Sequence, residues 1–298
     1  MKGHAHGKII LIGEHSVVYG HPAIALPFKA GETRCRLETH SEDRITSPFY
    51  NGLLNDADET FAPIVLLIRT LRKALGIGPF NHVLESDIPV GAGLGSSAAI
   101  AAAIVRAYYA SANVSLTDAL LFKWVQYSEK NAHDNPSGID ALTVIHDHPW
   151  YFTKARKEPL DGRLDAFLVV ADSQERTPTR DAVRHVASQQ GTYRFNAAME
   201  ILSKRVIDSK AAYKDGDLLS LGKAMNQAME ALFSLGLSTK KLDALIKTAK
   251  MNGALAAKLS GGGMGGCMIA LCENDVTARK VQNALEKNYG TRTWVTRI

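Results

Sequence analysis

Cysteine is scarce in this chain of 298 residues, with only three thiols, at Cys35, Cys267 and Cys272. Their number is odd and their spacing is not that of a zinc or redox motif, so we expect neither a disulfide framework nor a sulfur-based metal site. The fold must then rest on its hydrophobic core. With 46% hydrophobic residues, the chain can form one large domain or two ordinary ones. Free thiols indicate a reducing compartment.

Long apolar runs are also lacking. The stretch at residues 9–12 follows Lys2 but is ended by Glu14, so it does not have the length of a signal peptide. The run at residues 98–105 is rich in alanine, too short to span a bilayer and followed directly by Arg106. We therefore expect a cytoplasmic protein with no membrane partner.

Clustered basic charge is the third absence. The formal net charge is +5, yet basic residues gather only in the short run at residues 154–157. The other lysines and arginines are scattered among acidic residues, which is typical of a solvated surface. A cationic bias also suits an anionic substrate. We expect no nucleic-acid partner.

The order of the predicted elements favours an α+β fold. Apolar or alternating runs predict strands at residues 8–12, 23–26, 34–38, 83–88, 167–171, 255–259, 266–271 and 293–296. Helical periodicity predicts helices at residues 59–75, 96–112 and 280–287, one ending near residue 130, and several up to residue 251. Helices on one face of an antiparallel sheet fit this order. A charged stretch with Pro and Gly at residues 159–163 predicts two domains, 1–163 and 164–298.

The segment at residues 89–99 carries the strongest functional signal. It contains three glycines in five residues, at Gly91, Gly93 and Gly95. Ser96 and Ser97 follow at a predicted helix start, where free N–H groups and the helix dipole attract anions, so the segment predicts a polyphosphate cradle. No lysine follows the last glycine and the pattern is not GxGxxG, which excludes a P-loop and a Rossmann site. A tight turn with serine N-caps is the alternative.

Two carboxylates have places that suit such a cradle. Glu129 is expected near the C-terminal end of its helix, where the dipole disfavours negative charge, so binding of Mg²⁺ beside phosphates would explain it. The alternative is a solvent-facing glutamate paired with a neighbouring lysine. Asp140 follows a turn at residues 135–138 and is placed to accept the proton of an attacking hydroxyl. The alternative is the acidic member of a capping box opened by Ser137.

Two further segments remain ambiguous by themselves. Lys8 precedes four consecutive aliphatic residues, so it is either a strand-end residue reaching for solvent or a cation aimed into a cleft. His15, two residues after Gly13, allows a structural or a chemical role. The glycine cluster at residues 260–266 is too long for a simple hairpin turn, and its lack of bulk lets backbone approach a ligand or another loop. A flexible surface loop is the alternative.

Together and in this order, these segments resemble the motifs of the GHMP kinase family. The likeness rests on GKIILIGEHSVVYGHPAIALP at residues 7–27, PVGAGLGSSAA at residues 89–99 and KLSGGGMGGC at residues 258–267. It spans nearly the whole chain. Within the family, the first segment is most similar to the branch that phosphorylates mevalonate. The chain departs from many relatives at His6, where they have proline, and at Met264 among the glycines.

The resemblance implies a two-domain fold and a set of site residues. The N-terminal domain would be like ribosomal protein S5 domain 2, the C-terminal domain would be ferredoxin-like, and ATP would lie between them. Lys8 and Asp140 would be the catalytic cation and base, and Ser97 and Glu129 would hold Mg²⁺. The ATP-binding segment would consist of Pro89, Gly91, Ala92, Gly93, Leu94, Gly95, Ser96 and Ser97.

The resemblance also implies the reaction. The γ-phosphoryl group of ATP would be transferred to the primary hydroxyl of mevalonate, a step of isoprenoid biosynthesis. Glu14 and His15 of the first segment, and Thr179 in a loosely matching loop, would lie on the substrate side. Phosphomevalonate kinase or another small-molecule kinase of the family is the alternative, and a silent nucleotide sensor is a rival from another class. The resemblance suggests a homodimer.

Overall fold

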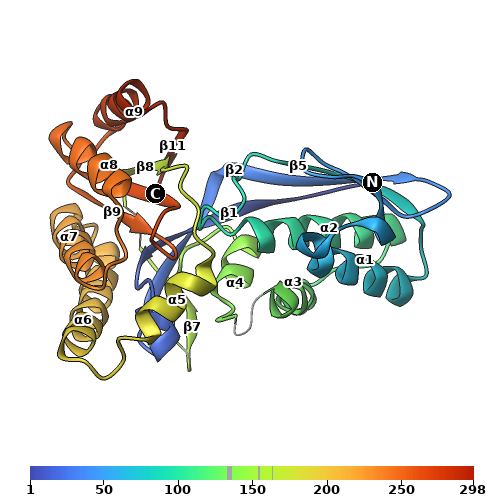
Figure 1. Ribbon diagram of the computed structural model, residues 1–298, viewed down its shortest axis with the longest axis horizontal. Helices are drawn as coiled ribbons and strands as arrows, with labels where there is room; N and C mark the ends of the chain where they lie inside the picture. The colour runs from blue at the N-terminus through green and yellow to red at the C-terminus, as the bar shows by residue number, and fades with distance from the viewer. Residues whose placement is uncertain (133–135, 154, 163) are drawn as a thin grey trace. The chain divides into compact units, whose positions relative to one another are not determined.

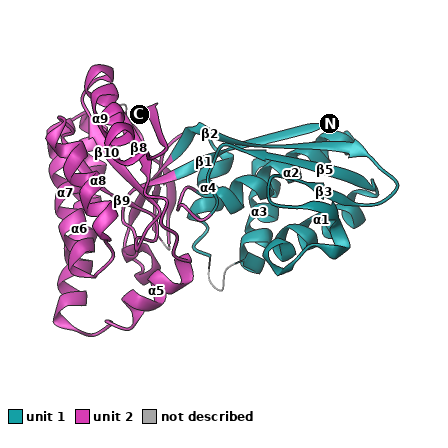
Figure 2. Cartoon of the chain, turned by 45° about the horizontal axis from the view of Figure 1, so that its top comes forward, with its two compact units in different colours: residues 1–8, 27–90, 95–147 teal, residues 9–26, 91–94, 148–298 magenta. Residues whose placement is uncertain are grey.

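The computed structural model describes residues 1–132, 136–153, 155–162 and 164–298 (Figure 1). Its contacts divide the chain into two compact units (Figure 2). Unit 1 contains residues 1–8, 27–90 and 95–147, and unit 2 contains residues 9–26, 91–94 and 148–298. The domain boundary expected at residue 163 stays a prediction, and that residue lies outside the described ones.

The sheet of unit 1 has the strand order β4-β3-β5-β2, with β1 also paired to β2. These strands are β1 (Lys2–Ile12), β2 (Ala23–Thr39), β3 (Arg44–Thr46), β4 (Asn51–Leu53) and β5 (Phe80–Ser86). β2 and β5 are antiparallel, with Cys35 opposite Leu84. Along the start of β1 exposed and buried residues alternate, because one face of the sheet is covered by helices.

Strand β2 corrects the prediction of two separate strands at residues 23–26 and 34–38. It runs without a break through Pro27, which lies between the residues that pair with β6 (Trp150–Phe152) and those that pair with β5. The missing N–H of this proline therefore removes no hydrogen bond from either of these two ladders. The first part of β2 belongs to unit 2 and the second part to unit 1.

Among the described residues of unit 1, four helices cover the sheet. They are α1 (Ala62–Leu75), α2 (Ser96–Ala112), α3 (Asp118–Ala132) and α4 (Ile139–Ile145), and the short 3-10 turns η2 (Leu54–Asp56) and η3 (Glu59–Phe61) precede them. Helix α2 is central and packs against the other three. Its alanines permit this, and β1 approaches so closely that a Cβ added at Gly3 would lie 2.2 Å from the carbonyl oxygen of Ala103.

Unit 2 contains a four-stranded antiparallel sheet of order β11-β8-β10-β9. Its strands are β8 (Phe167–Asp172), β9 (Ala256–Ser260), β10 (Cys267–Cys272) and β11 (Thr293–Arg297). The start of β2 pairs with β6, which pairs with β7 (Lys157–Pro159). The helical elements are η1 (Ser16–Tyr19), α5 (Thr179–Ala187), α6 (Tyr193–Asp215), α7 (Leu218–Ser234), α8 (Lys240–Met251) and α9 (Asp275–Tyr289).

The core of unit 2 lies between this sheet and its helices. Helices α7 and α8 pack on β9, and α9 packs on β8. All residues of β9 and β10 are buried, and the three cysteines of the chain are buried free thiols. The apolar stripe predicted for α8 is buried as expected, at Leu242, Leu245, Ile246 and Ala249. The fold is of the predicted α+β class.

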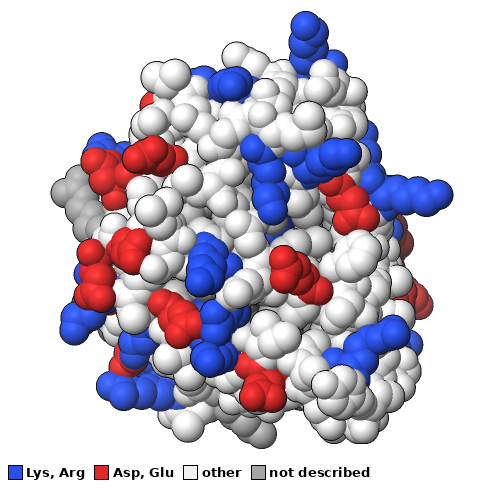
Figure 3. Space-filling model, turned by 90° about the vertical axis from the view of Figure 1, so that its left-hand side faces the viewer, with Lys and Arg blue, Asp and Glu red and all other residues white. Residues whose placement is uncertain are grey.

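Charge is mixed on the face where α6 to α9 lie. Figure 3 shows lysine and arginine side chains interspersed with aspartate and glutamate over this face. Among the residues that the structure describes, no helix combines the length and the apolar character needed to cross a bilayer.

Candidate active site

The start of α2 has the predicted glycine-rich turn directly before a helix. Gly91, Gly93 and Gly95 have φ angles of 72°, 81° and 74°, a conformation that residues with a Cβ rarely adopt. Gly95 is the N-cap of α2, so the first N–H groups of the helix are not used within it. Ser97 is exposed, whereas Ser96 is buried and its Oγ has no hydrogen-bond partner among the described residues.

The members of this segment are divided between the two units. Pro89 belongs to unit 1, the residues 91–94 belong to unit 2, and the chain returns to unit 1 at Gly95. The site residues expected from the sequence are therefore described within each unit. In unit 1 these are Lys8, Pro89, Gly95, Ser96, Ser97, Glu129 and Asp140; in unit 2 they are Glu14, His15, Gly91, Ala92, Gly93, Leu94 and Thr179.

In unit 1, Lys8 lies against the start of α2. A Cβ added at Gly95 would be 2.7 Å from Cγ of Lys8, so only glycine leaves room for this lysine. The Lys8 side chain is 6% exposed, which excludes the alternative of a strand-end lysine reaching for solvent. Its Nζ lies 3.1 Å from Oδ1 of Asp140. The structure thus brings together a cation, a carboxylate and a helix N-terminus.

Asp140 lies in the first turn of α4. The N-cap of this helix is Gly138, so the alternative of a capping box opened by Ser137 is wrong. The Oγ of Ser137 instead accepts a hydrogen bond from the N–H of Ile139. The Asp140 side chain remains 32% exposed beside Lys8, so solvent or a small molecule can reach it. The turn predicted before it starts at residue 135, outside the described residues.

Glu129 lies in α3, one of the helices that pack against α2 and α4. It is 4% exposed, so the alternative of a solvent-facing glutamate is wrong. A carboxylate is rarely buried without a strong interaction, because the loss of hydration is costly. Its burial keeps it a candidate for the cation site.

In unit 2, the chain turns sharply after β1. Gly13 has a φ of 104°, and a Cβ there would lie 2.5 Å from Cα of Ala23. His15 follows with a φ of 58°, and its Nε2 is 2.7 Å from the carbonyl oxygen of Gly262. Since a carbonyl can only accept, Nε2 carries the proton and donates. Burial lowers the pKa of His15 to about 4, so the ring is neutral at pH 7.

Glu14 forms an ion pair that sequence reasoning missed. Its Oε1 accepts a hydrogen bond from Nζ of Lys258 in β9, and the two side chains are 1% and 0% exposed. Burial lowers the pKa of the Lys258 ammonium, and the Glu14 carboxylate opposes this. A lone lysine inside an apolar strand, directly before the glycine cluster, was the available signal.

The glycine cluster at residues 260–266 packs against the segment 91–94. A Cβ added at Gly261 would lie 3.0 Å from Cα of Gly93, and one at Gly266 would lie 3.0 Å from the carbonyl oxygen of Ala92. The N–H of Cys267 donates to the same oxygen at 3.2 Å. The cluster is thus no loose surface loop: its lack of bulk allows backbone to lie on backbone.

Near these glycines lie Thr179 and an arginine that the sequence did not single out. Thr179 is exposed at the start of α5, and a Cβ at Gly262 would be 3.6 Å from its Cα. Arg176 makes two hydrogen bonds of 2.7 Å to the carboxylate of Asp172, which raise the pKa of the guanidinium. Its Cδ would lie 3.4 Å from a Cβ at Gly91, so a guanidinium borders the cradle.

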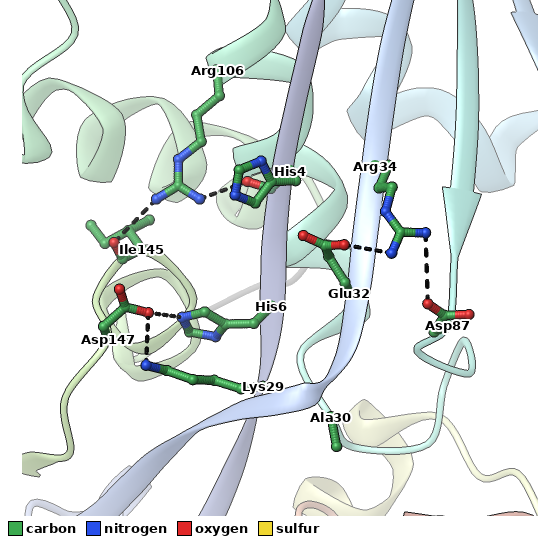
Figure 4. A pocket seen from close by; sticks show the side chains of 10 residues that line it. All are labelled: His4, His6, Lys29, Ala30, Glu32, Arg34, Asp87, Arg106, Ile145 and Asp147. Atoms are coloured by element: carbon green, nitrogen blue, oxygen red, sulfur yellow. Dashed lines mark hydrogen bonds and ion pairs between the residues drawn. The ribbon is translucent and has the colours of Figure 1, made fainter.

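A cavity of about 480 Å³ lies elsewhere in unit 1 (Figure 4). It contains none of the predicted site residues. Nε2 of His6 and Nζ of Lys29 lie 3.5 and 3.3 Å from Oδ1 of Asp147, and Arg106 donates to two backbone carbonyl groups. Its three cations are balanced by three carboxylates: Lys29, Arg34 and Arg106 against Glu32, Asp87 and Asp147. The cavity therefore lacks the excess of one sign that would favour a charged ligand.

The chain is similar to known proteins over almost its whole length. Residues 63–148 match the family model described as "GHMP kinases N terminal domain", and residues 209–291 match "GHMP kinases C terminal". A curated relative from Aeropyrum pernix, named mevalonate kinase, is 31% identical to this chain. The alignment covers 95% of this chain and 92% of the relative.

Solved structures show the same fold. The mevalonate kinase of Methanococcus jannaschii has 26% identity and a TM-score of 0.86, with 100% of this chain and 98% of that chain covered. Phosphomevalonate kinase of Streptococcus pneumoniae, in complex with phosphomevalonate and AMPPNP, has 19% identity and a TM-score of 0.84, with 100% of both chains covered. These matches confirm the two-domain fold expected from the motifs.

Proposed function

The chain belongs to the GHMP kinase family, and from that premise we propose that it transfers the γ-phosphoryl group of ATP to the primary hydroxyl of mevalonate, giving 5-phosphomevalonate. Curated relatives from Aeropyrum pernix and Pyrococcus furiosus, both 31% identical over most of the chain, are named mevalonate kinase. Use of ATP follows from the kinase family. One observation carries the chemistry: the contact of Lys8 with Asp140 beside the N-terminus of α2.

Phosphoryl transfer depends mostly on positioning and on stabilisation of charge. In the proposed site, the backbone of residues 91–97 and the positive end of the α2 dipole hold the phosphates. Pro89 lies three residues after the end of β5 and precedes this segment. The buried hydroxyl of Ser96 supports this, because it has no partner among the described residues and a phosphate oxygen would supply one.

Asp140 is the proposed general base. Its partly exposed carboxylate accepts the proton of the attacking hydroxyl, or orients that hydroxyl before attack. Lys8 has two tasks in this proposal. Its ammonium offsets the charge of Asp140 at 3.1 Å, and it stabilises the negative charge of the migrating phosphoryl group.

Ser97 and Glu129 are the proposed ligands of Mg²⁺. Their donors fit this ion, which prefers oxygen and usually takes one or two carboxylates together with phosphate oxygens and water. The exposed Ser97 lies in the first turn of α2, and α3, which carries the buried Glu129, packs on α2. When bound, the ion would neutralise charge on the β- and γ-phosphates.

The mevalonate end of the site is proposed at Gly262 in unit 2. Two residues expected on the substrate side, His15 and Thr179, both lie against this glycine. A neutral His15 adds hydrogen-bonding capacity without adding charge beside an anionic substrate. Glu14 directly precedes His15, and its carboxylate is held by Lys258.

The remaining proposals concern the setting of the enzyme. A cytoplasmic location is supported by the three buried free thiols, which suit a reducing compartment. The protein needs only small-molecule partners for this reaction, with no nucleic acid and no membrane. Family resemblance supports a homodimer.

A coupled assay of ADP release tests the proposed function. Purified protein with Mg²⁺ and ATP is given mevalonate, phosphomevalonate, homoserine or galactose in separate reactions. We expect the largest kcat/KM with mevalonate. Preference for phosphomevalonate would establish the alternative kinase, whose solved relative shares the fold at 19% identity. Absence of turnover with all four would favour a silent nucleotide sensor.

A further inference from the structure

The fully buried ion pair of unit 2 joins two motifs that are far apart in the sequence. Glu14 and Lys258 are separated by 244 residues, and neither side chain is more than 1% exposed. Nζ of Lys258 also donates to the carbonyl oxygen of Leu259 at 2.7 Å. The free energy lost when two charges leave water offsets much of the free energy gained from their attraction. Packed apolar residues of similar volume therefore often stabilise a fold equally well. The pair thus calls for a reason besides stability.

Two other contacts join the same segments. Oγ of Ser260 donates to the carbonyl oxygen of Ile10 at 2.9 Å and accepts from the N–H of Ile10 at 3.2 Å. His15 donates to the carbonyl oxygen of Gly262 at 2.7 Å. All these groups belong to unit 2. The turn after β1 and the end of β9 are therefore held in one register by directional polar contacts, with the ion pair as the most buried of them.

The segment held in this way is the base of the glycine cluster. Directly after Ser260, the cluster packs against Gly93 and Ala92 of the phosphate segment, so closely that a Cβ at Gly261 or Gly266 would force this backbone to shift. A small shift of β9 along its own axis would move the cluster, and with it the backbone of residues 91–94. Displacements of about 1 Å are enough to reduce the rate of an enzyme ~100-fold.

We propose that Lys258 and Glu14 are positioning residues for phosphoryl transfer, which set the register of the glycine cluster beneath the phosphate segment. The inference rests on the proposed function. In this proposal the two side chains act through the backbone that they hold, and not by touching the reacting atoms. The ammonium and the carboxylate form hydrogen bonds of defined direction. Nζ of Lys258 holds both the turn at Glu14 and the carbonyl group of Leu259. Two apolar side chains of equal volume would fill the space without fixing the register.

The test is the double variant Glu14→Met with Lys258→Met, compared with Lys258→Met alone and with the parent protein. We expect the single variant to unfold at a lower temperature, since it keeps a buried carboxylate without the Lys258 ammonium. The double variant should recover a thermal midpoint near that of the parent, yet its kcat should stay ~100-fold lower. If kcat recovers together with the thermal midpoint, the pair is only structural and the proposal is overturned.

A matched control uses an ion pair away from these motifs. Arg72 and Asp43 in unit 1 form such a pair, with the Asp43 side chain 10% exposed. The double variant Asp43→Leu with Arg72→Met should lower the thermal midpoint and leave kcat and both KM values within about twofold of the parent. If this control loses as much kcat as the test variant, loss of any partly buried pair explains the result and the proposal is overturned.

A second measurement distinguishes failure of the proposed function from failure of the positioning proposal. If the parent protein does not phosphorylate mevalonate, the function is wrong whatever the variants do. Positioning is then read from the Kd of AMPPNP with Mg²⁺ by calorimetry. Binding that is at least tenfold weaker in the Glu14→Met, Lys258→Met variant, at an unchanged thermal midpoint, supports the proposal. Equal binding in the variant and the parent overturns it.

Discussion

The two units each contain a lysine paired with a carboxylate near strand β1, and the pairs differ in exposure. Lys8 and Asp140 of unit 1 lie 3.1 Å apart, and the aspartate side chain is 32% exposed. Lys258 and Glu14 of unit 2 are almost completely buried. The same two charges therefore suit different tasks. The Asp140 carboxylate, which solvent reaches, can exchange a proton with a substrate, whereas the Glu14 carboxylate, held by Lys258 away from solvent, suits a task of holding its neighbours in place.

The largest effect is expected for Asp140→Asn. The amide keeps the size of the side chain but cannot act as a base, so kcat should fall ~1,000-fold while the Kd of AMPPNP stays within about threefold. Steady-state kinetics and calorimetry measure these two quantities.

Asp147→Asn is the matched control for this change. Asp147 is 79% exposed, lies beyond the other end of α4 and lines the separate cavity (Figure 4), so kcat should not change. Full activity of Asp140→Asn would show that Asp140 is not the base, and the two ion pairs would then not differ in chemical role.

The second prediction concerns stability. Lys258→Met should lower the free energy of unfolding by ~3–5 kcal/mol, because the change leaves the Glu14 carboxylate in the interior without its ammonium. Lys8→Met should lower it by less than ~1 kcal/mol, because solvent screens the partly exposed Asp140. Urea unfolding of the two variants measures the difference. Equal losses would mean that burial does not distinguish the pairs.

The third prediction concerns the pH dependence of stability that arises from His15, the residue after Glu14. The pKa of His15 is about 4 in the folded protein and 6.5 as the ordinary value, so the unfolded chain binds more protons between these pH values. Stability from this residue is complete above pH 6.5 and is lost as the pH falls towards 4, by at most about 3 kcal/mol.

His15→Gln keeps an N–H for Gly262 and removes this titration, so the fall in thermal midpoint below pH 6.5 should become shallower. Some slope should remain, because burial also lowers the pKa values of His6 and His82. His40→Gln, at an exposed histidine, is the control for replacing a histidine by glutamine and should leave the thermal midpoint at pH 7 near that of the parent. An unchanged profile in His15→Gln would contradict the prediction.

The smallest effect is expected for Gly95→Ala against Gly76→Ala. Both glycines lie at helix ends with left-handed φ angles of 74° and 66°, so each alanine should cost about 1–2 kcal/mol of stability. Only at Gly95 would the new methyl group meet another residue, at 2.7 Å from Lys8, while Gly76 has open space around it. We expect kcat to fall at least ~10-fold in Gly95→Ala alone. Equal kcat values would show that the position of Lys8 is not critical.

Local features of the site were predictable from the sequence because their signals are local. Glycine spacing and the following serines predicted the turn before α2, and the bounds of α2 agree with the expected residues 96–112. The start of α1 was placed too early, since residues 59–61 form a 3-10 turn before Ala62. The roles of Lys8, Asp140, Ser97 and Glu129 stay predictions until variants are measured.

Contacts between distant segments were not predictable in the same way. Nothing near Glu14 in the sequence indicates Lys258, and the glycine cluster alone did not reveal that it lies against Gly93. The continuity of β2 through Pro27 also depends on pairing partners far along the chain. Periodicity and turn residues report the conformation of a segment, but the partner of a buried charge depends on the completed fold.

Unit 2 combines segments from the start and from the end of the chain, and this has a consequence for synthesis on the ribosome. Residues 9–26 are among the first to be made, yet the rest of unit 2 comes mainly from residues 148–298. The apolar end of β1 must therefore wait for most of its neighbours until translation is almost complete, and contacts of such long sequence separation form slowly. A nascent chain stopped before β9 would lack the contacts of Ser260 with Ile10, and apolar surface left uncovered in this way favours aggregation.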